Sequence, residues 1–120
     1  MKNPGLRYGL AIVLLAGAAV AAQPDRPVVT MTIAAAGEKP HEVEVRESGL
    51  AEIKVKGAAF GFRPTIQDSK PWTRVVVTIF KMDPQAEPVG EVEVKTGGSA
   101  VQSKTKPAFR IGVLKVFDKP

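Results

Sequence analysis

Apolar and polar residues alternate with a period of two along most of this chain after residue 26. The clearest run is Glu91–Lys95, in which Val92 and Val94 stand between charged residues. Because successive side chains of a β-strand point to opposite faces of its sheet, this period is typical of strands with one buried and one solvated face. The same pattern recurs in Val28–Ile33, His41–Arg46 and Ala51–Lys56. The sequence therefore predicts antiparallel sheets.

Two further segments predict strands of a different kind. Arg74–Phe80 is apolar on both faces, which favours a central, well-covered strand. Phe109–Phe117 begins with alternating apolar residues and then changes phase, which indicates a β-bulge near Gly112.

Turn-forming residues separate these segments at short intervals. Gly97-Gly98 follows Glu91–Lys95 directly, and two adjacent glycines can adopt the positive φ angles of a two-residue hairpin turn. No segment has an apolar repeat of helical spacing. About seven short strands with frequent turns predict an all-β fold, an antiparallel β-sandwich that is immunoglobulin-like in its gross layout.

The N-terminus has the three parts of a secretory signal peptide. Lys2 and Arg7 precede an apolar run from Gly9 to Ala22, which ends abruptly before Gln23. This run is shorter than the roughly 20 residues of a membrane-spanning helix. Small residues permit cleavage before Ala22 or before Gln23. We therefore expect residues 1–22 to be a cleaved signal peptide and residues 23–120 to form a single domain, periplasmic or secreted, that does not span the membrane after cleavage.

The composition narrows the class of protein further. The chain has no cysteine, so neither lipid attachment at an N-terminal cysteine nor a disulfide is available, and the hydrophobic core must hold the fold alone. Of the 17 basic residues, Lys2 and Arg7 belong to the signal peptide, which leaves 15 against 12 acidic residues. The expected mature domain is thus only mildly basic.

No catalytic constellation is visible in the sequence. A nucleophilic serine needs a neighbouring base, and His41 is the one histidine of the chain. Glu91 and Glu93 share a strand face, but carboxylates that alternate with valine usually form a solvated face. We expect no enzyme, no cofactor and no metal site. The alternative is a small periplasmic ligand or copper carrier, for which Met31, Met82 and His41 supply soft ligands.

The window Gly57–Arg74 is the most distinctive part of the chain. It combines aromatic and arginine side chains, which dominate the energetics of protein interfaces. If its aromatic side chains are exposed, they form a binding site for a peptide, a sugar or a partner protein. If they are buried, they cover the end of the core. The candidate binding residues are Phe60, Phe62, Arg63, Trp72 and Arg74.

Basic residues are concentrated in the C-terminal quarter. Residues 95–120 contain six basic residues and only Asp118 as an acid. This segment is either a cationic surface for an anionic glycan or lipid, or a lysine-protected sheet edge. Nucleic acid is not expected, because the basic residues lack interleaved aromatic residues. Together, these features predict an exported, non-catalytic binding or structural module of the bacterial cell envelope that contacts another envelope protein or a glycan.

Overall fold

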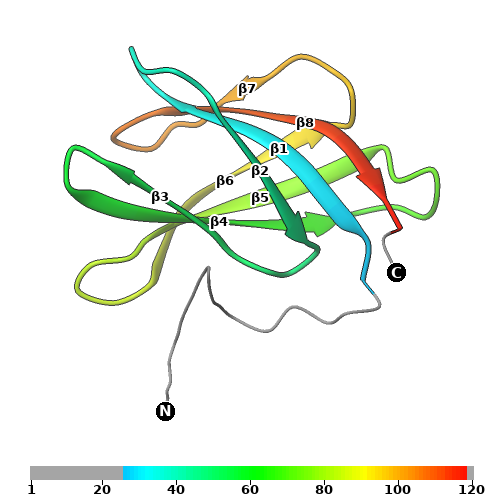
Figure 1. Cartoon of the computed structure of the whole chain (residues 1–120), viewed down its shortest axis with the longest axis horizontal. Coiled ribbons are helices and arrows are strands. Elements are labelled where there is room, and N and C mark those ends of the chain that lie inside the picture. Colours follow the sequence, from blue (N-terminus) through cyan, green and yellow to red (C-terminus); the bar gives the residue numbers. More distant parts are fainter. Residues whose placement is uncertain (1–25, 119–120) are drawn as a thin grey trace.

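The protein is an all-β structure of two antiparallel sheets (Figure 1). The computed structural model describes residues 26–118, and no helix occurs among them. The expected signal peptide, residues 1–22, lies outside this range. The described strands are β1 (Val28–Ala35), β2 (His41–Arg46), β3 (Ala51–Val55), β4 (Ala58–Ile66), β5 (Arg74–Lys81), β6 (Glu87–Lys95), β7 (Val101–Gln102) and β8 (Phe109–Phe117).

Each sheet contains four strands. Sheet 1 has the order β2-β1-β8-β7 and sheet 2 has the order β3-β4-β5-β6. Every paired neighbour is consecutive in the chain except β1 and β8, which join the two ends of the domain. Immunoglobulin domains instead interleave strands through Greek-key connections. The strand order therefore differs from the immunoglobulin-like layout that we expected.

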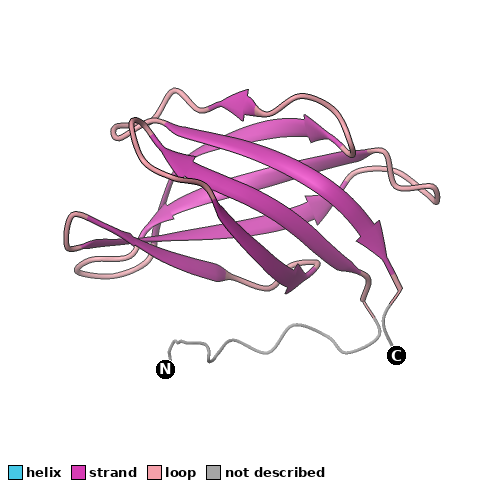
Figure 2. Ribbon diagram, turned by 45° about the horizontal axis from the view of Figure 1, so that its top comes forward, coloured by secondary structure: helices cyan, strands magenta, loops and turns pink. Residues whose placement is uncertain are grey.

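The core fills the space between the two sheets, which lie as two layers in Figure 2. The period-two pattern places alternate residues of each strand inside, among them Val29, Met31 and Ile33 of β1. From β8, Phe109 contacts both Phe60 and Phe62 of β4 edge to face, with ring centroids 5.1 and 5.0 Å apart. This aromatic cluster links the two sheets across the core, and its edge-to-face pairs are favoured by the ring quadrupoles.

The chain changes sheets at two places. Between β2 and β3, the backbone N–H of Ser48 donates to the carbonyl of Pro64 at 2.8 Å. After β6, Thr96 forms an isolated bridge with Val113 of β8, and the N–H of Gly97 donates to the Val113 carbonyl at 2.8 Å. Gly97 has the positive φ that we expected, at 75°. The predicted hairpin is nevertheless wrong, because β6 and β7 lie in different sheets.

The structure confirms one detail of the predicted strands and corrects another. The register of β1 with β8 passes from Lys115 to Val113, so the predicted bulge is present, and its extra residue is Leu114, two residues after Gly112. Half of the window Gly57–Arg74 is strand β4, even though that strand contains Pro64. Proline is tolerated there because the pairing of β3 with β4 ends at Phe62, so no neighbouring strand needs a donor at Pro64 on that side.

Candidate functional site: the β4–β5 loop

The five candidate binding residues separate into three environments. Phe60 and Phe62 point into the core, with exposed fractions of 7% and 0%. Their side chains are therefore part of the core and are not available on the surface for binding.

Arg63 lies on the outer face of sheet 2. Its guanidinium carbon is 4.9 Å from the centroid of the Phe80 ring, a cation–π arrangement across β4 and β5. The Nε atom of Arg63 is buried and has no hydrogen-bond acceptor within residues 26–118. Burial lowers the pKa of this guanidinium. Its stacking on Phe80 fixes the side chain to the sheet, away from the loop that follows.

The loop between β4 and β5, residues 67–73, is organised by the carboxylate of Asp68. One carboxylate oxygen, Oδ2, accepts a hydrogen bond from the backbone N–H of Thr73 at 3.0 Å and another from the Thr73 hydroxyl at 2.5 Å. The second oxygen, Oδ1, accepts one from the N–H of Arg74 at 3.3 Å. Asp68 thus holds the end of the loop against its beginning, a local use of aspartate that is common in turns.

These contacts lower the pKa of Asp68. The main cause is the hydrogen bond from the Thr73 hydroxyl, and the backbone N–H groups of Thr73 and Arg74 and the charge of Arg74 act in the same direction. Desolvation opposes them. Because hydrogen bonds to the charged form favour it, Asp68 remains an acceptor throughout the neutral range.

Trp72 occupies an unusual backbone conformation in this loop. Its φ angle is 55°, in the left-handed region that bulky residues rarely adopt. Its N–H donates to the Ser69 carbonyl at 3.0 Å, and its own carbonyl accepts from the Thr96 hydroxyl at 2.8 Å. The side chain is half-buried. The hydrogen bonds on both sides of Trp72 hold its backbone in this conformation.

The Lys70 side chain lies over the Trp72 ring and also contacts Asp118, the residue after β8. The Lys70 ammonium lies 5.0 Å from the ring centroid and 3.1 Å from a carboxylate oxygen of Asp118. Arg74, at the other side of the loop, has its guanidinium 3.5 Å from the carboxylate of Glu93 on β6. Both ion pairs are solvent-exposed, so they contribute little to stability. The loop therefore presents a half-buried aromatic ring beside the ammonium group of Lys70.

Trp72 in the β4–β5 loop and Arg74 at the start of β5 thus lie in one segment, apart from the other three candidates, while their side chains contact different residues. Sequence reasoning missed Asp68, Lys70 and Thr96, which form the surroundings of Trp72. The sequence pattern that could have indicated the role of Asp68 is an aspartate five residues before a threonine in a polar segment. This pattern is too common to identify a site. Thr96 is distant in sequence, so no local pattern could identify it.

The side chains considered for copper lie apart in the fold. Met31 is fully buried in the core, and His41 is exposed at the start of β2. Met82 lies just after β5 and is close to Gly61. Within residues 26–118, no group of three or more histidine, cysteine, aspartate or glutamate side chains could hold a metal ion.

No protein-family model, curated protein or solved structure matches the chain. Over the described residues there is also no helix of the length and apolarity needed to cross a membrane.

Proposed function

We propose that this chain is an exported, non-catalytic binding module of the cell envelope, and that it captures a protein partner through the β4–β5 loop. Trp72 supplies the main contact, and Lys70 and Arg74 flank it. The export step rests on the N-terminal sequence pattern alone. The binding step rests on the conformation of the loop.

The observation that carries this proposal is the positive φ of Trp72. A non-glycine residue in the left-handed region costs about 1–2 kcal/mol, and the cost is highest for bulky side chains. Glycine would adopt this conformation without strain. Strained residues held by a surrounding hydrogen-bond network are concentrated at functional sites. A tryptophan at such a position indicates that the indole ring serves a purpose that glycine could not.

The surroundings of Trp72 suit a contact surface. The loop is fixed by Asp68 and Thr96, so binding would cost little conformational entropy. Tryptophan and arginine are the residue types most often found at the centres of protein interfaces. Lys70 and Arg74 have exposed side chains, at 68% and 53%, which favours a partner with acidic groups around an apolar centre.

Site-specific photocrosslinking in intact cells tests this proposal. A photoreactive residue at Ser69, an exposed position of the same loop, should give a protein adduct. The matched control is a photoreactive residue at Glu52, which is exposed on β3. We expect the probe at Ser69 to give an adduct that the probe at Glu52 does not give. The Ser69 adduct should be lost in a variant that also carries Trp72→Gly.

Either of two results would overturn the proposal. One is a pattern of adducts that is the same from Ser69 and Glu52. The other is an adduct from Ser69 that persists undiminished in Trp72→Gly. Degradation of the adduct by a glycan-cleaving enzyme, but not by a protease, would assign the loop to a glycan and not to a protein.

A further inference from the structure

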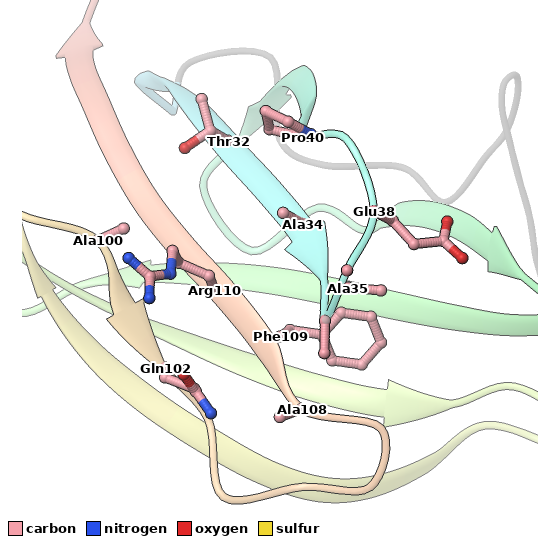
Figure 3. A pocket seen from close by; sticks show the side chains of 12 residues that line it. Thr32, Ala34, Ala35, Glu38, Pro40, Ala100, Gln102, Ala108, Phe109 and Arg110 are labelled. Atoms are coloured by element: carbon pink, nitrogen blue, oxygen red, sulfur yellow. The ribbon is translucent and has the colours of Figure 1, made fainter.

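A second candidate site lies on the outer face of sheet 1, separate from the β4–β5 loop. A groove of about 590 Å³ runs over β1 and β8 between the turn after β1 and the segment that leads into β7 (Figure 3). This volume is within the range of about 300–1,000 Å³ that is typical of sites for small ligands.

The groove exists because the outer faces of β1 and β8 carry small residues at this end. Thr32 and Ala34 of β1 line it. Opposite Thr32, β8 has Gly112, where an added Cβ would lie 2.9 Å from the Thr32 hydroxyl and 3.6 Å from the Ala100 methyl. Solvated strand faces usually carry long polar side chains that fill such a space. Here the floor is formed by methyl groups.

Two polar side chains stand at one wall of this apolar floor. Arg110 of β8 and Gln102 of β7 are direct neighbours in the register of the two strands. Both are exposed, and neither side chain makes a hydrogen bond or ion pair with a residue in the described range. Figure 3 shows the Arg110 guanidinium extending toward Ala100.

Two hydrogen bonds between Ser103 and Phe109 fix the wall that carries these two side chains. The backbone N–H of Ser103 donates to the Phe109 carbonyl at 2.7 Å, and the Phe109 N–H donates to the buried hydroxyl of Ser103 at 2.8 Å. At the opposite wall, the N–H of Ala36 donates to the Ala108 carbonyl at 3.2 Å. Both walls are thus tied to the start of β8, one at Phe109 and the other at the preceding residue Ala108, so the groove is formed before any ligand arrives.

We infer that this groove binds the C-terminal end of a peptide with small apolar residues. The carboxylate would accept hydrogen bonds from the Arg110 guanidinium and the Gln102 amide, since a guanidinium matches a carboxylate in charge and in planar geometry. The alkyl side chains of the peptide would contact the methyl floor at Ala34 and Ala100. Among the lining residues the one aromatic side chain, Phe109, is buried in the core, so no exposed ring is available for stacking a sugar.

Titration of the purified protein with acetyl-Ala-Ala-Ala, followed by two-dimensional ¹H–¹⁵N NMR, tests this inference. The free acid should shift the amide signals of Ala34, Gln102 and Arg110. The same peptide with a C-terminal amide should bind about tenfold more weakly or worse, because it lacks the charge-assisted hydrogen bonds. Equal affinity of the acid and the amide, or no shift with either, would overturn the inference.

Three variants separate the contributions of the groove. Arg110→Gln should abolish the preference for the acid, and Ala34→Leu should fill the floor and remove binding of both peptides. Lys104→Gln, a change of charge in the same basic segment but outside the groove, should leave both affinities unchanged. If Arg110→Gln still preferred the free acid to the amide, Arg110 would not be the group that binds the carboxylate. Binding of a uronic-acid disaccharide at these residues, without binding of the peptide, would also contradict the inference.

Peptide binding in the groove does not depend on the β4–β5 loop. Trp72→Gly leaves the groove intact, so peptide binding should persist in a variant that has lost its crosslink from Ser69. If the experiment on one of the two sites contradicts its proposal, the other site can still be tested.

Discussion

The carboxylate of Glu47 accepts a hydrogen bond from the backbone N–H of Ile66 at 2.8 Å and thereby joins the end of β2 in sheet 1 to the end of β4 in sheet 2. Its second oxygen is 3.0 Å from the guanidinium of Arg26. Glu47 is only 7% exposed. A buried carboxylate with both oxygens occupied is a strong connection, because removal of either partner leaves a polar group unsatisfied.

Glu47→Ala should lower the free energy of unfolding by about 2–3 kcal/mol, since it leaves the N–H of Ile66 without an acceptor. Glu47→Gln keeps an acceptor oxygen and loses only the charge, so its cost should be about 1 kcal/mol. Urea unfolding measures both, with the exposed Glu52→Gln as the control. Equal costs for the two substitutions at Glu47 would contradict the proposed hydrogen bond.

Phe62→Ala should cost about 3–5 kcal/mol, the range for truncation of a fully buried phenylalanine. The physical reason is the loss of the edge-to-face contact with Phe109 together with the cavity that remains. Thermal or urea unfolding measures the loss. Phe80→Ala, on the half-buried outer face, is the comparison and should cost clearly less. A small loss in Phe62→Ala would mean that Phe62 is not part of the core.

Thr30→Val should raise the free energy of unfolding by about 1 kcal/mol. Thr30 is 4% exposed, and its hydroxyl has no hydrogen-bond partner in the described part of the chain. Valine has nearly the same shape and buries a methyl group where threonine buries an unsatisfied hydroxyl. Thr32→Val, at a half-buried position of the same strand, serves as the comparison. A loss of stability in Thr30→Val would indicate that the hydroxyl is satisfied in solution.

Acid should release the β4–β5 loop through Asp68. Its pKa is lowered in the folded protein, mainly by the Thr73 hydroxyl. The contribution of Asp68 is therefore fully present above the unfolded pKa of about 3.9 and is lost as the pH falls through the lower, folded pKa.

The fluorescence of Trp72 reports this transition, because the chain has a single tryptophan. The emission should change only below about pH 3.9. Asp68→Asn should lack this step, whereas Asp83→Asn, in another exposed loop, should retain it. A step of the same size in Asp68→Asn would show that another group causes it.

The strands of this fold were predictable wherever side chains alternate. The predicted bounds of His41–Arg46 and Phe109–Phe117 agree with β2 and β8. Strand β4 was missed because it contains Gly61 and Pro64, which are uncommon inside strands, although Phe60 and Phe62 alternate in the pattern of a buried face. The strand order was not predictable, because the sequence does not show that the connection at Gly97 crosses between sheets.

The candidate site was predictable only in part, for a similar reason. Aromatic and arginine density directed attention to the region that contains Trp72, but density does not distinguish a core phenylalanine from a half-buried tryptophan in a loop. The feature that sets Trp72 apart from the core phenylalanines is its positive φ angle, and one of the hydrogen bonds that hold its backbone comes from Thr96, distant in the chain. The groove beside Arg110 was also invisible, because it results from small residues on two strands that pair only in the fold.

The most direct test of the account compares the stability and the partner capture of Trp72→Gly. Because glycine relieves the left-handed strain, the free energy of unfolding should change by no more than about 1 kcal/mol. The crosslink from Ser69 should disappear in the same variant, and Trp72→Phe, which retains a ring, should recover part of it. A loss of several kcal/mol with an undiminished crosslink would mean that Trp72 stabilises the fold and does not contact a partner.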